Sequence, residues 1–125
     1  MIEKDENGNI LIRQGDTGEI IFGDNNSGFN PDYNFIVYFS VRDENGNLMF
    51  PEIMTTTNNS MTATITLDAD TTDLLTVPEG EETAIYYWGL KAVKSGSDEE
   101  HTIYPKLGQK CLMIVYRKYV EGPKQ

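Results

Sequence analysis

The sequence predicts an all-β protein, a β-sandwich of about seven or eight strands with one short helical turn near residues 69–75. Two observations predict this fold class. No segment of helical length repeats apolar residues at the spacing of an amphipathic helix. Short alternating or continuous apolar runs recur instead, bounded by Gly, Asn, Asp and Pro, and this pattern is typical of sandwiches and barrels.

The most regular run is Ala84–Val93, which contains the single tryptophan of the chain. Successive side chains of a strand point to opposite faces, so Trp88 shares a bulky apolar face with its neighbours two residues away. The opposite face, which includes Tyr87 and Lys91, is mixed and suits either solvent or a partner. The residues predicted for the core are Phe35, Val37, Phe39, Tyr86, Trp88, Leu90, Leu112 and Ile114.

Each expected strand is an apolar run that ends at turn-forming residues. In order along the chain, the ranges are 9–14, 17–23, 34–42, 47–53, 61–67, 83–94, 101–106 and 110–119. Gly15 separates the first two strands and allows a bend or bulge there. The runs Phe35–Phe39 and Cys111–Tyr116 are apolar throughout, which indicates strands covered on both faces. One face would meet the second sheet, and the other is covered by a loop or offered to a partner. Two such strands therefore favour an oligomer.

Turn residues join these strands. Asp43–Asn47 has the sequence of a tight hairpin, because Asn-Gly tolerates positive φ, and Asp5–Asn9 repeats the same five residues. Ser95–Asp98 is expected to form a second hairpin after the tryptophan strand. The segment 23–31 is predicted to be the least ordered loop, and residues 119–125 are predicted to fray as a tail.

Residues 68–75 fit no strand. Asp68 or Asp70 is expected to cap a single helical turn that brings Leu74 and Leu75 onto the edge of the core. The segment Val77–Gly80 then ends the turn and leads into the tryptophan strand.

The overall composition predicts one globular domain spanning residues 1–125, because 38% of the residues are hydrophobic and 24% are charged. No apolar run approaches the roughly 18 residues of a spanning helix. The first residues show no secretory signal peptide. Cys111 is the only cysteine, so an intrachain disulfide is excluded. It is expected to be a buried strand residue, and a bridge to another chain or a reactive thiol is the alternative.

The charge of the chain is divided unevenly. Residues 101–125 carry five basic side chains and one acid, a net charge of +4, so residues 1–100 carry −14 of the total of −10. An acidic surface disfavours binding to nucleic acid and to anionic membranes. The basic end either pairs with acidic strands of the same molecule or contacts a neighbouring subunit.

Residues with catalytic or metal-binding chemistry are few. His101 is the only histidine, and a hydrolytic triad or a zinc site needs more partners than the chain provides. Asp24, Asn26 and Asp32 have the oxygen ligands that Ca²⁺ prefers, but their spacing matches no helix–loop–helix calcium site. We therefore expect no enzyme, no cofactor and no resident metal.

Tyrosines are the strongest candidates for binding. Tyr33, Tyr38, Tyr87 and Tyr104 are suited to stacking on sugars or to anchoring a protein interface, although tyrosine is also common in strands for packing. The residues predicted for an interface are Tyr38, Tyr87, Tyr104, Arg117 and Lys118. A carbohydrate-binding module, with or without calcium in the 24–34 loop, is the alternative function.

The order of several short motifs resembles a known family. These motifs are Ile12–Thr17, Phe39–Asp43, Ile65–Leu67, Asp70–Thr71, Pro78–Gly80, Tyr86–Lys91 and Thr102–Pro105, which is followed by Gly108. The chain resembles the immunoglobulin-like antiparallel β-sandwich at the N-terminus of phage baseplate upper proteins, and related tail proteins of phages and prophages of Gram-positive bacteria.

The resemblance implies a structural protein of the virion that is made in the bacterial cytoplasm. It implies other tail or baseplate subunits as partners, often in a symmetric assembly that includes further copies, and it brings no catalytic residues. A non-enzymatic interaction domain of a tail or baseplate, acting through sheet surfaces and edge strands, is therefore the leading expectation.

Overall fold

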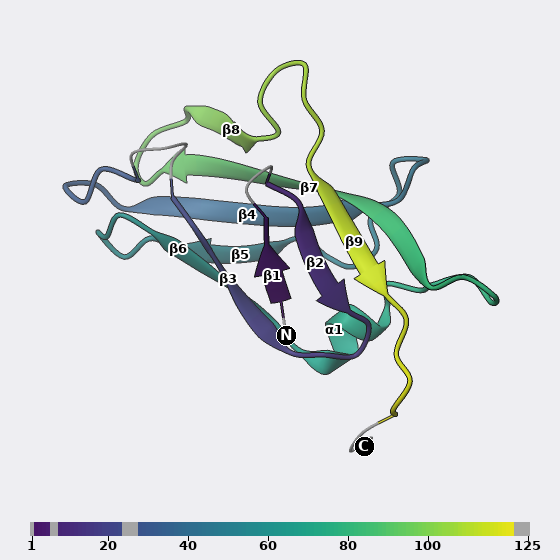
Figure 1. Cartoon of the computed structure of the whole chain (residues 1–125). Helices are drawn as coiled ribbons and strands as arrows, with labels where there is room; N and C mark the ends of the chain where they lie inside the picture. Colours follow the sequence, from purple (N-terminus) through teal and green to yellow (C-terminus); the bar gives the residue numbers. More distant parts are fainter. Residues whose placement is uncertain (1, 6–7, 24–27, 122–125) are drawn as a thin grey trace.

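The computed structural model describes residues 2–5, 8–23 and 28–121, and the predicted fold class is confirmed. Strands make up nearly all of the regular structure (Figure 1). The elements are β1 (Ile2–Lys4), β2 (Ile10–Arg13), β3 (Gly18–Phe22), β4 (Phe35–Arg42), β5 (Ile53–Thr56), β6 (Ala63–Leu67), α1 (Ala69–Asp73), β7 (Thr83–Lys94), β8 (Glu100–Tyr104) and β9 (Leu112–Tyr116).

Seven of the described strands form a large sheet in the order β1-β2-β9-β7-β4-β5, with β8 beside β7, and β3 pairs with β6 in a small second sheet. The pairing of β2 with β9 is parallel, whereas the other strand pairs are antiparallel. The large sheet is therefore mixed, and the expectation of a purely antiparallel sandwich is wrong in this respect. Two strands far apart in the sequence can run side by side in the same direction because no tight hairpin has to join them.

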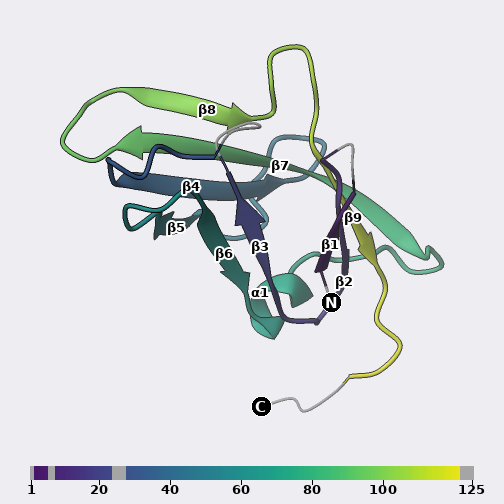
Figure 2. The ribbon, with the colours of Figure 1, turned by 60° about the vertical axis from the view of Figure 1, so that its left-hand side comes forward.

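The large sheet curls around the small one (Figure 2). β1 contacts β3, and β5 contacts β6, so both ends of the large sheet reach the second sheet. At the first contact Gly18 lies against Ile2, and a Cβ on Gly18 would come within 2.8 Å of the Ile2 side chain. A glycine at position 18 therefore permits this close approach.

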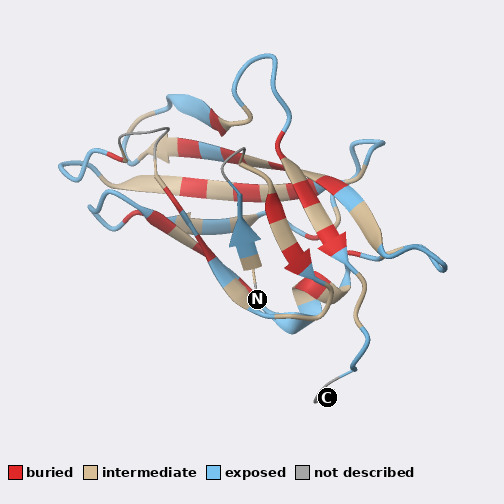
Figure 3. Cartoon of the chain, viewed as in Figure 1, coloured by how far each residue is buried: buried red, intermediate tan, exposed pale blue. Residues whose placement is uncertain are grey.

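Buried residues recur along the strands of both sheets (Figure 3), and aromatic rings pack together in the core between them. The ring centroid of Trp88 lies 5.2 Å from that of Phe22 and 6.1 Å from that of Phe39. Val37, Phe39, Tyr86, Trp88 and Leu90, all predicted for the core, are buried. Phe35 is half-buried and packs against this core.

The predicted core positions Leu112 and Ile114 are wrong. Both side chains are half-buried, and the buried residues of β9 are Met113 and Val115. The register explains this result, because Met113 lies opposite Tyr86, whose side chain faces the core. Since every residue from 111 to 116 is apolar, the sequence pattern carried no information on which alternate set faces inward.

The expected strand at 47–53 is also wrong. Leu48 forms only an isolated bridge with Arg42, and the strand β5 begins at Ile53. Pro51 interrupts this segment and has no N–H for a sheet ladder. β1 was not expected, and the last strand ends at Tyr116, before the predicted limit of residue 119.

Aspartate side chains organise the turns. Asp43 Oδ1 accepts hydrogen bonds from the backbone N–H groups of Asn45 and Asn47, both at 2.9 Å. Asp5 Oδ1 accepts the equivalent bond from Asn9 at 2.9 Å. The repeated five-residue motif therefore closes both turns by the same Asp–Asn contact, while residues 6–7 lie outside the described part. Ser97 N–H donates to the Lys94 carbonyl in the expected hairpin between β7 and β8.

The helical turn lies where it was predicted. Asp68 is its N-cap, and its carboxylate accepts hydrogen bonds from the Thr71 side chain and, at 2.8 Å, from the Thr71 N–H, so its pKa lies below the usual value. The expectation that both following leucines reach the core is half right. Leu75 is buried, whereas Leu74 is 50% exposed because consecutive residues at the end of a helix point in different directions.

Candidate functional site

The most distinctive surface is the outer face of the large sheet, meaning the side that faces away from β3 and β6. Strand registers place Leu11, Ile114 and Ile85 in one row across β2, β9 and β7. Leu112 and Tyr87 form the next row. Ile85 is 53% exposed, and the other four are half-buried. The described chain thus leaves a continuous apolar strip of side chains in contact with solvent.

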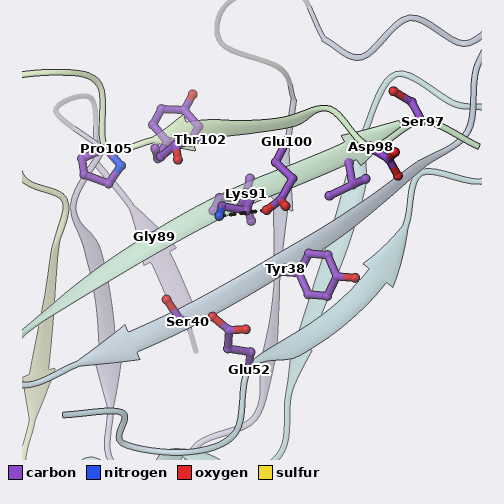
Figure 4. A pocket seen from close by; sticks show the side chains of 13 residues that line it. Tyr38, Ser40, Glu52, Gly89, Lys91, Ser97, Asp98, Glu100, Thr102 and Pro105 are labelled. Atoms are coloured by element: carbon purple, nitrogen blue, oxygen red, sulfur yellow. Dashed lines mark hydrogen bonds and ion pairs between the residues drawn. The ribbon is translucent and has the colours of Figure 1, made fainter. Parts of the chain in front are cut away.

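A hollow of about 620 Å³ lies on the same face, over β4, β7 and β8 (Figure 4). Tyr38, Glu52, Lys91, Glu100 and Thr102 are among the residues that line it. A second hollow of about 460 Å³ adjoins it. The residues shared by both hollows are Ser40, Gly89 and Pro105.

Gly89 joins the two hollows because it has no side chain to divide them. A Cβ at this position would lie 3.4 Å from the Tyr104 carbonyl oxygen and 3.8 Å from Ser40 Oγ, which are ordinary contacts. We call the joined depression the Gly89 trough. A larger side chain at residue 89 would project into it, whereas the strand itself would tolerate the change.

The first hollow is acidic. Three carboxylates, those of Glu52, Asp98 and Glu100, line it together with one ammonium group, that of Lys91. Lys91 Nζ lies 3.0 Å from Glu100 Oε1, so this pair is neutralised within the hollow. Glu52 and Asp98 contribute the excess negative charge.

The second hollow lies between a turn and a loop. Asp43 and Glu44 line the turn side, and Lys110 lines the loop side with its ammonium group 5.7 Å from the centre of the Tyr87 ring. Hydrogen bonds from Asn47 hold the pKa of the Asp43 carboxyl below its usual value. Burial raises the pKa of the Cys111 thiol, so this thiol stays protonated at neutral pH.

The loop at residues 105–110 projects beyond the sheet between β8 and β9 (Figures 1 and 2). Leu107 is fully exposed, and the sequence places Lys106 and Lys110 on either side of it. A large apolar side chain at the tip of a projecting loop gains nothing from packing within the described chain.

The structure separates the residues predicted for an interface. Tyr38 lines the first hollow and Tyr87 the second, so both lie on the outer face. Tyr104 also touches the first hollow, but its ring packs 5.3 Å from that of Trp88 and 6.4 Å from that of Phe22. It therefore serves the core, which differs from the exposed role expected for it.

The two basic interface candidates lie near the end of the chain, away from these hollows. Lys118 Nζ is 2.7 Å from Asp73 Oδ1, and the Lys118 side chain is only 20% exposed. The Arg117 carbonyl accepts a hydrogen bond of 2.6 Å from Arg13 Nη1, and the Arg117 side chain is half-buried. The Lys118 pair favours the intramolecular one of the two interpretations of the basic C-terminal region.

Tyr119 lies in the same C-terminal segment. Its hydroxyl donates to the Glu82 carboxylate, which raises the pKa of the phenol.

The remaining candidates lie apart from the trough. His101 is exposed on β8, with Nε2 3.7 Å from Glu99 Oε2, and Cys111 is buried as predicted. Asp32 is exposed, while Asp24 and Asn26 lie outside the described residues. In the described ranges, no three His, Cys, Asp or Glu side chains gather in a way that could hold a metal ion. No helix there combines the length and apolar character needed to cross a membrane.

Sequence reasoning missed the exposed residues Ile85 and Leu107. The pattern did place Ile85 on the face opposite Trp88, but the partners of that face on β2 and β9 depend on register. The glycine after Lys106 and Leu107 is a sequence signal of a loop, because glycine favours turns. In the structure, Gly108 adopts a positive φ of 79°.

Comparisons with known proteins bear on the fold alone. No family model matches the chain, and no curated protein matches it. Among solved structures, the periplasmic chaperone SfaE is similar with a TM-score of 0.56 and 10% sequence identity. The match covers 93% of this chain and 57% of that chain, so this chain spans little more than half the length of the chaperone. This likeness supports an immunoglobulin-like β-sandwich.

Proposed function

We propose that this protein is a non-enzymatic interaction domain of a phage or prophage tail or baseplate, which binds other subunits through the outer face of its large sheet. The observation that carries the proposal is the apolar row Leu11–Ile114–Ile85, which stays partly exposed in the middle of the sheet. Contiguous apolar surface of this kind is typical of protein–protein contacts.

The surroundings of the row fit such a contact. Tyr87 and Leu112 extend the apolar surface on one side of it. On the other side, Tyr116 pairs with Arg13, whose guanidinium group lies 5.9 Å from the ring centre. Interfaces commonly combine an apolar centre with tyrosine and arginine. In addition, β8 pairs only with β7 among the described strands, and an open strand edge can accept a strand from a partner.

The assignment to a tail or baseplate depends on the ordered motifs of the sequence. These motifs resemble the N-terminal sandwich of baseplate upper proteins across nearly the whole chain, and the observed all-β architecture is compatible with that resemblance. Genes for tail, tape-measure or lysis proteins beside this gene would support the same assignment.

Binding to tail subunits tests the proposal. The purified protein is immobilised, and the products of neighbouring tail genes are passed over it while binding is measured optically. We expect at least one of them to bind, and Ile85→Asp to weaken that binding by about tenfold or more, because a charge would be desolvated in the contact. Ile21→Asp is the matched control, since Ile21 is 59% exposed on β3 in the other sheet.

Two results would contradict the proposal. One is the absence of binding to every tail subunit tested. The other is an equal loss of binding affinity for Ile21→Asp and Ile85→Asp. This result would place the contact elsewhere or indicate a general effect of charge.

A carbohydrate-binding module is the second candidate, favoured by the first hollow. Tyr38 offers an aromatic ring there, and Ser40, Glu52 and Thr102 offer groups for hydrogen bonds to sugar hydroxyls. A glycan array, read with and without calcium, separates the candidates. Hits that Tyr38→Ala abolishes would assign the hollow to a sugar, whereas the tail proposal predicts no hits.

A further inference from the structure

The 105–110 loop and the first hollow of the Gly89 trough carry opposite net charges. We propose that the protein associates with a second copy of itself by inserting the 105–110 loop of each molecule into the Gly89 trough of the other. This inference goes beyond the proposed function, because it names an occupant for a surface next to the apolar row.

The loop has the properties of a docking element. Leu107 is fully exposed at its tip, and burial of a leucine side chain is favourable by about 1.5–3 kcal/mol. Lys106 and Lys110, both exposed, give the loop a net charge of +2. The loop is therefore suited to a partner surface that combines apolar area with negative charge.

The two hollows of the trough supply these properties separately, because the second is lined mainly by apolar surface and the first, lined mainly by polar groups, carries the negative charge. The first hollow has three carboxylates and one ammonium group, a net charge of −2, which balances the loop. Gly89 leaves its floor open, and the ring of Tyr38 supplies an apolar wall. The volume of about 620 Å³ is ample for a leucine side chain together with part of a loop.

Within one molecule Pro105 and Lys110 line the trough, whereas the fully exposed Leu107 does not enter it. Pro105 lies on the rim shared by both hollows, and the loop that follows β8 then projects away from the sheet (Figure 1). Each molecule therefore presents the inserting loop and the receiving trough side by side. Two copies related by a two-fold axis can exchange both contacts, as an isologous interface requires.

A second copy fits better than an anionic membrane, although an exposed leucine between lysines would also suit a lipid surface. Residues 1–100 carry −14 and the whole chain −10, so an anionic bilayer and a second copy would both repel the acidic bulk of the molecule, but only the second copy offers a hollow beside its carboxylates for the leucine. The same imbalance makes the acidic part of one copy a suitable target for the basic loop of another. Because only one loop and one hollow contribute from each side, we expect a weak dimer.

Sedimentation velocity of the full chain across concentrations from micromolar to millimolar tests the inference. We expect reversible dimerisation that Leu107→Ser weakens by about tenfold. Leu74→Ser is the matched control, because Leu74 is 50% exposed beside α1 and should leave the association unchanged. Gly89→Val should also block association, because the added side chain would occupy the floor of the trough.

Charge exchange gives the sharpest test. The variant Lys106→Glu/Lys110→Glu and the variant Glu52→Lys/Asp98→Lys should each stay monomeric, because loop and hollow would then carry the same sign. When the two variants are mixed, both loop–hollow contacts regain opposite charges, and mixed dimers should form.

Several outcomes would overturn the inference. These are a wild-type protein that stays monomeric throughout, dimers that are insensitive to both Leu107→Ser and Gly89→Val, or variants that fail to pair on mixing. Binding of the monomer to phosphatidylglycerol vesicles that requires Leu107 would assign the loop to a lipid surface instead. Each of these results would leave the Ile85-dependent binding of tail subunits intact, so the two proposals fail separately.

Discussion

At the scale of single residues, Trp88 determines the packing between the two sheets. Its ring contacts Phe22, Phe39 and Tyr104, with centroid distances between 5.2 and 6.1 Å. Its Nε1 atom is buried and has no hydrogen-bond partner among the described residues, which costs part of the free energy gained by burial. Packing area therefore explains the position of this indole, and hydrogen bonding does not.

Substitutions at two adjacent residues test this assignment of faces. We expect Trp88→Ala to lower the free energy of unfolding by about 3–5 kcal/mol, because a large cavity would remain. Tyr87→Ala should cost clearly less, since Tyr87 is half-buried on the outer face. Chemical denaturation of both variants measures the difference. Equal losses would show that the outer face is covered in the protein as it exists in solution.

At the scale of elements, β9 shows how register selects a face. Both alternate sets of the strand are apolar, so each could have packed inward. Pairing with β7 places Met113 opposite Tyr86 and Ile114 opposite Ile85. Which set faces inward is therefore a property of the pair of strands. As a result, Ile114 lies on the proposed contact surface, although the sequence predicted it for the core.

Shortening side chains of β9 to alanine tests which alternate set of this strand faces the core. Met113→Ala removes a fully buried side chain and should lower the free energy of unfolding by about 2–5 kcal/mol. Ile114→Ala should lower it by less than half as much, because that side chain still contacts solvent. Thermal and denaturant unfolding provide the comparison. A larger loss for Ile114→Ala would indicate that the strand is shifted by one residue in solution.

At the scale of the whole molecule, the two sheets are joined at their margins as well as through the core. The parallel pair of β2 and β9 brings the beginning and the end of the chain together, and β1 then reaches β3. The ion pair of Lys118 with Asp73, at 2.7 Å, holds the segment after β9 against α1. These contacts link residues that are distant in the sequence, so they form only when the complete fold is present.

The contact between β1 and β3 can be tested with a double-mutant cycle. Gly18→Ala should destabilise the protein, because its Cβ would overlap the Ile2 side chain. The same substitution in an Ile2→Ala background should cost less, since the two nearest atoms of the Ile2 side chain are then absent. Unfolding free energies of the four proteins give the coupling between the two positions. A coupling of zero would mean that β1 does not contact Gly18 in solution.

Much of the fold follows from local sequence. Alternation placed Trp88, its neighbours on β7 and the core residues of β4 correctly, because the period of a strand is a local property. Asp68 and the Asp43–Asn47 turn were identified for the same reason, since each closes hydrogen bonds within a few residues. The length of the chain and its charge division also needed no structure.

Tertiary structure decided the features that depend on which strands meet. Four features depend on register between distant segments: the inward set of β9, the parallel partner of β2, the packing of Tyr104 against Trp88, and the apolar row across Leu11, Ile114 and Ile85. When both faces of a strand are apolar, the hydrophobic pattern does not indicate which face packs inward or which strand lies beside it. The chain resolves them only by packing all strands around one core, and that packing is what leaves the outer face open.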